Sequence, residues 1–177
     1  MEFTADWFSS HIPNWERLLR PWAGQPIQAL EVGSYEGRSA VWLLQEILTH
    51  PEARLTCVDR WEWSDIQRRF RANIQETGRS QQVIECVGNS AQALRSLTGP
   101  YDFIYVDGSH EARDIVTDIA LAWPMLRVGG LLALDDYNWN GDVDFPPRFA
   151  IDMFLQLWMT QMEVVHKRWQ VFVKRRV

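Results

Sequence analysis

The sequence predicts a single doubly wound α/β domain, in which helices cover both faces of a mostly parallel sheet. Three observations indicate this fold. Short apolar runs alternate along the chain with segments of helical periodicity. The runs are apolar at successive positions, as in strands that are buried on both faces. Acidic, glycine and serine residues cluster just after the runs, where such sheets bind ligands. A length of 177 residues fits one domain that spans residues 1–177.

Apolar runs rich in branched and aromatic residues are predicted to be the parallel strands. In chain order these runs are 27–33, 54–60, 82–88, 102–108 and 130–136. Right-handed crossovers between them place the intervening helices on the two faces of the sheet.

Apolar residues between the runs recur with the spacing of one helical face. The three sets are Ala40, Leu43, Leu44, Ile47 and Leu48, then Ile66, Phe70 and Ile74, then Ile115, Ile119, Ala122 and Leu126. Ser64 and Ser90 stand where helix N-caps are expected. Each set therefore predicts a helix with one buried face.

Charge and composition favour a small-molecule ligand. The net charge is −5, and no Lys/Arg cluster precedes the C-terminal "VKRRV", which argues against nucleic acid as a partner. No apolar run is long enough to cross a membrane, and the N-terminus does not resemble a signal peptide. Cys57 and Cys86 are predicted to be buried thiols in a reducing cytoplasm, with a disulfide as the lesser alternative.

The first strand-to-helix turn, "EVGSYEGRS", marks the expected binding edge of the sheet. Its glycines allow a ligand to approach the backbone closely, and the following helix presents amide groups. Gly33 and Gly37 do not form the Gly-x-Gly-x-x-Gly pattern that cradles a dinucleotide pyrophosphate. This departure disfavours a nicotinamide-dependent enzyme.

Several motifs occur in one order along the chain: "EVGSYEGRSAVWLL", "TCVDRWEW", "VGNSAQAL", "VDGSH" followed by "DDY", and "HKRWQVFVKR". This order resembles class I S-adenosylmethionine-dependent methyltransferases. Within them it is most similar to the small metal-dependent O-methyltransferases, which include macrocin and aminocoumarin sugar O-methyltransferases and cephalosporin-hydroxylase-like proteins. That branch carries Gly-Ser-aromatic-x-Gly-x-Ser as its first motif, which accounts for Tyr35. The resemblance extends from about Leu30 to the C-terminus.

The resemblance implies a Rossmann-like, seven-stranded sheet with an antiparallel C-terminal strand and a bound S-adenosylmethionine. The short turn at 167–169, between two β-rich runs, independently predicts that final hairpin. The implied cofactor-binding residues are Glu31, Gly33, Ser34, Tyr35, Gly37, Ser39, Asp59, Arg60, Trp61, Asn89, Ser90 and Asp107.

Each cofactor-binding role has a structural alternative. The start of the helix after the turn would bind the methionine carboxylate, and Glu31 would bind the ammonium group. The alternative is that the turn and Glu31 have only a structural role. Asp59 would accept the ribose hydroxyls, with Arg60 or Trp61 against the adenine, or else form a surface pair with Arg60. Asn89 and Ser90 would meet the adenine edge, or simply cap a helix.

The chemistry is expected after the fourth and fifth strands. Asp107, Asp135 and Asp136 would share one rim, and oxygen-only ligands select Mg²⁺ or another hard divalent ion. Asp135 and Asp136 can share an ion only if the strand has already ended, because successive strand residues point to opposite faces. Otherwise one of the two is a ligand and the other a capping or solvated acid.

His110 is the expected general base, because a histidine can accept a hydroxyl proton near neutral pH. Asp107 is the second candidate for that catalytic role, and a helix-capping His110 is the structural alternative.

Residues 1–26 are predicted to form a helical lid or packing segment. Trp7 and Trp139 could wall the acceptor site, whereas packing is favoured for Trp15 and Trp22. Trp123 and Trp158 are predicted to lie in the core.

The sequence therefore predicts a cytoplasmic, metal-assisted O-methyltransferase that acts on a small hydroxylated molecule. The prediction is compatible with a homo-oligomer. The alternatives are a nicotinamide-dependent oxidoreductase and a non-catalytic ligand-binding protein that keeps the fold.

Overall fold

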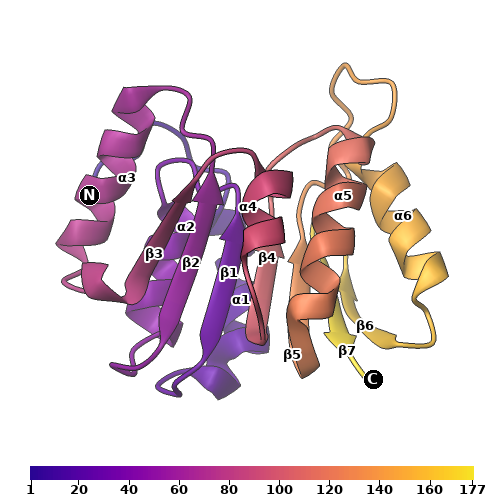
Figure 1. Cartoon of the computed structure of the whole chain (residues 1–177), viewed down its shortest axis with the longest axis horizontal. Helices are drawn as coiled ribbons and strands as arrows, with labels where there is room; N and C mark the ends of the chain where they lie inside the picture. The colour runs from indigo at the N-terminus through magenta and orange to yellow at the C-terminus, as the bar shows by residue number, and fades with distance from the viewer.

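The computed structural model describes residues 1–177 as three layers with a single sheet in the middle (Figure 1). The strands are β1 Gln28–Val32, β2 Arg54–Asp59, β3 Val83–Val87, β4 Tyr101–Val106, β5 Leu126–Leu134, β6 Met162–Lys167 and β7 Val171–Arg175. The α-helices are α1 Ile12–Leu19, α2 Arg38–Trp42, α3 Ser64–Glu76, α4 Ser90–Ser96, α5 Ala112–Ala122 and α6 Pro147–Leu157. Short helical turns are η1 Ser9–His11, η2 Arg20–Trp22, η4 Ser80–Gln82 and η5 Trp123–Met125, and α2 continues as the π-helix η3 Leu43–Ile47.

The seven strands run in the order β3-β2-β1-β4-β5-β7-β6. Neighbouring strands from β3 to β5 are parallel, and β7 lies antiparallel to both β5 and β6. The predicted fold class is therefore confirmed, including the final hairpin and its antiparallel strand.

Apolar side chains from alternate positions of the strands form two cores, one on each face of the sheet. The core on the face of α1, α2 and α3 centres on Trp15, Leu44 and Phe70. The core on the opposite face, under α4, α5 and α6, includes Ile104, Ile119 and Phe154. Figure 1 shows α4, α5 and α6 together in front of the sheet. None of the helices combines the length and the apolar character needed to cross a membrane.

Three details of the sequence prediction are wrong. Strand β3 is not buried on both faces: it forms an edge of the sheet, and Ile84 on it is 49% exposed. Leu126 does not continue the face of α5, because η5 ends that helix and Leu126 begins β5 beside Tyr101. Ser64 and Ser90 are the first helical residues and make no side-chain cap; Trp63 and Asn89 hold the N-cap positions.

Both cysteines are free thiols, Cys57 fully buried in β2 and Cys86 partly buried in β3. The disulfide alternative is therefore not realised. Trp123 is buried as predicted, whereas Trp158 is only partly buried at the end of α6.

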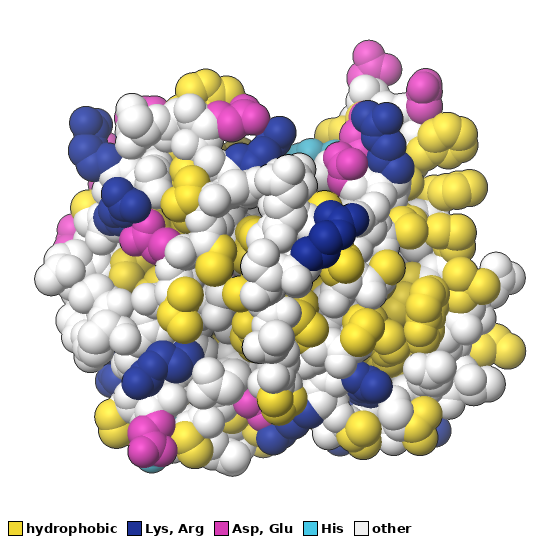
Figure 2. Space-filling model, in the orientation of Figure 1, with side chains coloured by type: hydrophobic (Ala, Val, Ile, Leu, Met, Phe, Trp, Pro, Cys, Tyr) yellow, Lys and Arg dark blue, Asp and Glu magenta, His cyan; other side chains and the backbone are white.

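The order of the strands reverses at β1, which has β2 on one side and β4 on the other. The connections after β1 and β4 consequently lead to opposite faces and leave an opening at the carboxyl edge of the sheet. A notch in the upper edge of Figure 2 lies above this edge in Figure 1, bordered by acidic and basic side chains.

Candidate functional site

A cavity of about 1240 Å³ lies along the carboxyl edge of the sheet. Its walls come from the turns after β1 to β5, from α5 and from the N-terminal segment. Among the predicted site residues, those that line it are Gly33, Ser34, Tyr35, Ser39, Asp59, Arg60, Asn89, Ser90, Asp107, His110, Asp135 and Asp136. The fold therefore gathers most of the predicted site in one place.

Asp59, the last residue of β2, fastens the turn that follows β1. Its Oδ2 accepts hydrogen bonds from the backbone N–H groups of Ser34 at 2.9 Å and Tyr35 at 2.8 Å. Its Oδ1 accepts one from the backbone N–H of Trp61 at 2.8 Å. The predicted surface pair with Arg60 does not form, because Arg60 pairs with Glu62 at 3.0 Å.

Glycine is required at two points of this turn. Gly33 has φ +88°, and a Cβ there would lie 2.1 Å from the carbonyl oxygen of Asp107. Gly37 has φ +81°, and a Cβ there would lie 2.8 Å from the ring of Phe70. Gly33 thus lets the ends of β1 and β4 approach closely, whereas Gly37 serves the packing of α3 and does not line the cavity.

Trp61 was predicted to lie against the adenine, but it does not line the cavity. It is buried, packs against Phe70 with ring centroids 4.6 Å apart, and donates its indole N–H to the carbonyl oxygen of Tyr35 at 2.8 Å. Sequence reasoning placed it beside Asp59 correctly, but its backbone φ of 41° turns the side chain beneath the loop. The exposed Trp63, two residues later, lines the cavity instead.

Glu31 lies fully buried below the turn and outside the cavity lining. Ser39 donates its hydroxyl to Glu31 Oε1 at 2.5 Å, and the Cys57 thiol lies 3.7 Å from Oε2. Burial raises the pKa of Glu31 to about 7. The predicted direct contact with a cofactor ammonium group is not available from this position; Glu31 instead positions Ser39 at the start of α2.

A tyrosine that the sequence reasoning missed joins two of the acidic residues. The Tyr105 hydroxyl lies 2.8 Å from Asp107 Oδ2 and is also hydrogen-bonded to Asp135 Oδ2. A phenol has one proton to donate, so it cannot satisfy both carboxylates when both are ionised. Partial desolvation beside the buried Tyr105 and the charge of the nearby Asp135 raise the pKa of Asp107 above its ordinary value.

Gln170, also missed, holds Asp135 from the final hairpin. Its side-chain N–H donates to Asp135 Oδ2 at 2.7 Å, and its Oε1 accepts the indole N–H of Trp15 at 2.8 Å. Trp15 is fully buried, so α1 is connected to Asp135 through one buried and one partly buried hydrogen bond. Packing therefore accounts for Trp15, as predicted.

His110 and Asp136 form a pair at the mouth of the cavity. His110 Nε2 lies 2.9 Å from Asp136 Oδ2, and the imidazole stacks on Trp139 with centroids 4.4 Å apart. Asp136 has φ +60°, and β5 has already ended at Leu134, so the polypeptide has left the strand as the sequence interpretation required. The hydrogen bond to Asp136 raises the pKa of His110.

The predicted metal trio does not form a metal centre in this arrangement. No three side chains among His, Cys, Asp and Glu gather into a group that could hold an ion. The reason is their orientation: Asp135 turns toward Tyr105 and Gln170, while Asp136 turns toward His110. The oxygen-only chemistry of the trio fits a hard ion, but the geometry does not.

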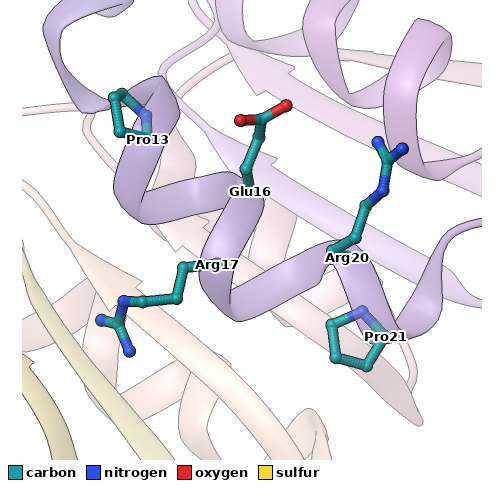
Figure 3. A pocket seen from close by; sticks show the side chains of 5 residues that line it. All are labelled: Pro13, Glu16, Arg17, Arg20 and Pro21. Carbon is teal, nitrogen blue, oxygen red and sulfur yellow. The ribbon is translucent and has the colours of Figure 1, made fainter.

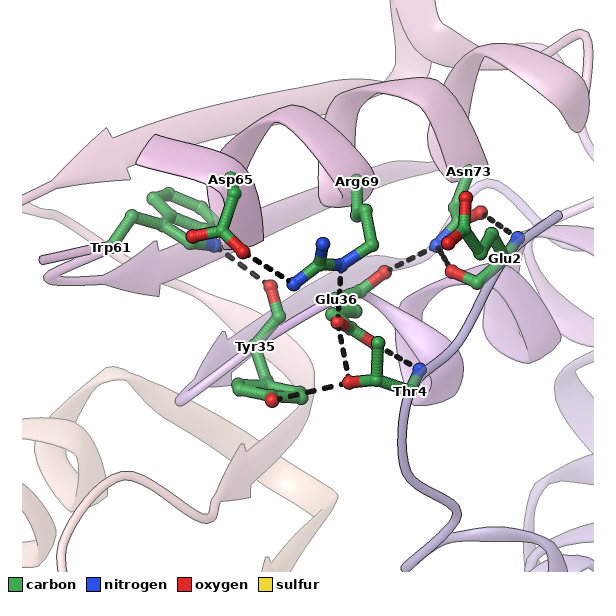
Figure 4. A network of polar contacts seen from close by, with 8 residues as sticks. All are labelled: Glu2, Thr4, Tyr35, Glu36, Trp61, Asp65, Arg69 and Asn73. Carbon is green, nitrogen blue, oxygen red and sulfur yellow. Dashed lines mark hydrogen bonds and ion pairs between the residues drawn. The ribbon is translucent and has the colours of Figure 1, made fainter. Parts of the chain in front are cut away.

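A polar network ties the N-terminal segment to the β1 turn (Figure 4). Glu36 is almost fully buried, and it accepts hydrogen bonds from the backbone N–H and hydroxyl of Thr4 at 2.6 and 2.8 Å. Arg69 on α3 donates to the same carboxylate at 2.5 Å. Asn73 adds bonds to the carbonyl oxygens of Glu2 and Glu36. The segment therefore enters the cavity wall through contacts that no local sequence pattern indicated.

Another hollow lies on α1 and the turn after it (Figure 3). It is lined by Pro13, Glu16, Arg17, Arg20 and Pro21. In Figure 3 the side chains of Arg17 and Arg20 point in different directions, so they do not converge on a ligand.

A doubly wound sheet with an antiparallel seventh strand, and a cavity where the strand order reverses, defines a Rossmann-like domain of the methyltransferase type. Residues 30–137, more than half of the chain, match a family described as a methyltransferase domain. The chain therefore belongs to this methyltransferase family, which confirms the resemblance found in the sequence.

Solved structures share the fold. TomG, an O-methyltransferase of tomaymycin synthesis from Streptomyces achromogenes solved with S-adenosylmethionine, is 19% identical with a TM-score of 0.72, covering 93% of this chain and 80% of TomG. MycE, from mycinamycin biosynthesis and solved with Mg and S-adenosylhomocysteine, is 18% identical with a TM-score of 0.68, covering 97% of this chain and 51% of MycE. A Clostridium thermocellum structure named as an rRNA methylase has a TM-score of 0.78 at 10% identity, covering 94% of this chain and 96% of that one. A search of curated proteins found no match.

Proposed function

We propose that this protein is an S-adenosylmethionine-dependent methyltransferase that transfers a methyl group to a hydroxyl of a small molecule. One observation carries the proposal: a single cavity has the β1 turn, Asp59 and Asn89 along its lining and the His110–Asp136 pair at its mouth. The methyltransferase family and the cofactors bound to TomG and MycE support the identity of the methyl donor.

The cofactor would lie across the ends of β1, β2 and β3. Its amino-acid part fits between the turn at Gly33 and Ser39 in the first turn of α2, and its ribose fits beside Asp59. Of the roughly four acceptor positions of the Asp59 carboxylate, three accept backbone N–H groups, which leaves about one on Oδ1 for a ribose hydroxyl. The adenine would then meet Asn89 and Ser90, the residues at the start of α4.

His110 is proposed as the general base. Its Nε2 is engaged by Asp136, so the acceptor's hydroxyl proton would be taken up at Nδ1. When bound, the cofactor would supply the methyl group: its carbon–sulfur bond would break as the acceptor oxygen attacks, and the electron pair would stay on sulfur, which would lose its positive charge. Asp136 holds the imidazole in place and stabilises the imidazolium that forms. Asp107 is the second candidate for the proton acceptor.

Aromatic side chains at the mouth favour a ring-containing acceptor such as a sugar or a phenol. Trp7, Trp139 and Trp169 line the cavity, and Trp7 is 70% exposed beside the Tyr35 ring at 5.2 Å. Flat apolar surfaces at these positions would bind such a ring and exclude water from the methyl transfer. Residues 1–10 would then serve as part of the acceptor wall.

The divalent ion stays a separate part of the proposal, supported only by the oxygen chemistry of Asp107, Asp135 and Asp136. When bound, such an ion would lower the pKa of an acceptor hydroxyl. Because Asp107 and Asp135 converge on the Tyr105 hydroxyl while Asp136 turns toward His110, the proton transfer is assigned to the chain's own residues.

The test is methyl transfer from S-adenosylmethionine to a panel of sugars, catechols and simple phenols, with primary amines included as a contrast. Formation of S-adenosylhomocysteine together with a methyl ether would support the proposal. Transfer to amines alone would overturn the O-methyl assignment, and binding without turnover on any acceptor would favour a ligand-binding protein that keeps the fold.

A further inference from the structure

The wall of the cavity between α4 and α5 contains a carboxylate that the proposed chemistry does not use. Asp118 on α5 lines the cavity, yet the residue is only 1% exposed. Neither of its side-chain oxygens has a hydrogen-bond partner. Burial raises the pKa of this carboxyl to about 6.

An unpartnered buried carboxylate is costly, because it has lost water without gaining donors. The nearby Ser90 hydroxyl partly opposes the rise in the pKa of Asp118, but it forms no hydrogen bond of normal geometry. Asp114, one turn earlier on α5, adds a like charge that raises it further. The site therefore lacks a donor, and a ligand in the cavity could supply one.

The position of Asp118 indicates which part of a ligand would meet it. The turn from β3 into α4, Gly88 to Ala91, lines the same cavity as Asp118. Asn89 and Ser90 bring groups that can donate and accept, whereas Ala91 brings no polar side-chain atom. Asp114 also lines the cavity, but it accepts the Ser109 hydroxyl at 3.0 Å and is half-exposed. Asp118 is therefore the buried, unoccupied acceptor along this part of the wall.

We propose that Asp118 accepts a hydrogen bond from the 6-amino group of the cofactor's adenine and so selects adenine over a 6-oxo purine. The proposal rests on the proposed function, since it needs an adenine nucleoside in this cavity. The amino group carries two N–H donors and no charge, which suits a buried acceptor. A 6-oxo purine would instead direct an oxygen lone pair at the carboxylate and leave both groups without a donor.

The experiment is calorimetry of the full chain with S-adenosylhomocysteine and with its 6-oxo analogue, S-inosylhomocysteine. We expect the wild type to prefer the adenine ligand by about 10- to 100-fold, the range for one hydrogen bond to a charged group. Asp118→Asn offers an amide that can donate to the 6-oxo group, and it is expected to reduce this preference by about tenfold or more. Asp114→Asn, on the same wall, is the matched control and should keep the wild-type preference.

The ratio of the two affinities separates recognition from a merely structural role, which would weaken both ligands equally. An unchanged ratio in Asp118→Asn, or in Asp118→Ser if the first variant does not fold, would overturn the assignment while leaving the proposed function standing. Equal affinities in the wild type would overturn it as well. If the wild type binds neither ligand, the proposed function itself fails.

Discussion

Replacing Glu31 by Gln tests the buried acid below the β1 turn through the pH dependence of stability. In the folded protein the pKa of Glu31 is raised from 4.5 to about 7. Between these values the folded state holds a proton that the unfolded state has lost, so wild-type stability falls as the pH rises through this window. The contribution is fully present below the unfolded pKa and is lost as the pH approaches and passes 7.

The size of the effect follows from the shift. At about 1.4 kcal/mol per pKa unit, a rise from 4.5 to about 7 corresponds to about 3 kcal/mol over the whole titration. Glutamine keeps the shape of the side chain and cannot ionise. We therefore expect the difference in unfolding free energy between Glu31→Gln and wild type to shift in favour of the variant by about 2 kcal/mol between pH 5 and pH 8.

The assay is urea unfolding of the unliganded protein at intervals across that range, with the exposed Glu16→Gln as the control. Other buried acids, such as Asp118, titrate in both proteins, so the difference isolates Glu31. A difference that stays constant with pH would refute the reasoning, because it would show that Glu31 titrates alike in the folded and unfolded chains.

The remaining predictions concern binding and catalysis. His110→Ala should reduce turnover by about 10²-fold or more with little change in cofactor affinity; unchanged turnover would assign the proton to another acceptor. Asp59→Ala should weaken S-adenosylhomocysteine binding by about 1 to 3 kcal/mol in calorimetry, and equal affinity would remove Asp59 from the cofactor site. Tyr105→Phe removes the donor that Asp107 and Asp135 share and should cost about 1 kcal/mol of unfolding free energy, measured in urea. If a divalent ion takes part in the reaction, chelation should abolish methyl transfer. Full activity in the presence of a chelator, together with full activity of Asp135→Asn and Asp136→Asn, would exclude the ion from the mechanism.

The sequence predicted the sheet well because the runs that form β1, β2, β4 and β5 are apolar at successive positions and are followed by polar turns. It failed for β3, since an edge strand has the same composition as a central one. Exposure of Ile84 depends on which helices cover the edge, and that is decided by tertiary packing.

The sequence predicted which residues lie at the site, but not the directions in which their side chains point. Position after a strand placed Asp107, His110 and Asp136 at one edge, as parallel strands require. Whether Glu31 and Trp61 face the cavity depends on the conformation of the turn, which the sequence does not specify. Tyr105 was missed because it resembles any other apolar residue in its strand, although its hydroxyl contacts two acids.

The central claim is that this cavity binds an S-adenosyl nucleoside as the donor for methyl transfer. Isothermal titration of the purified chain with S-adenosylhomocysteine and, separately, with NAD tests it most directly. The account predicts micromolar or tighter binding of S-adenosylhomocysteine, corresponding to about −8 kcal/mol or more favourable, and no measurable heat with NAD. Tight NAD binding, or no binding of S-adenosylhomocysteine, would contradict it.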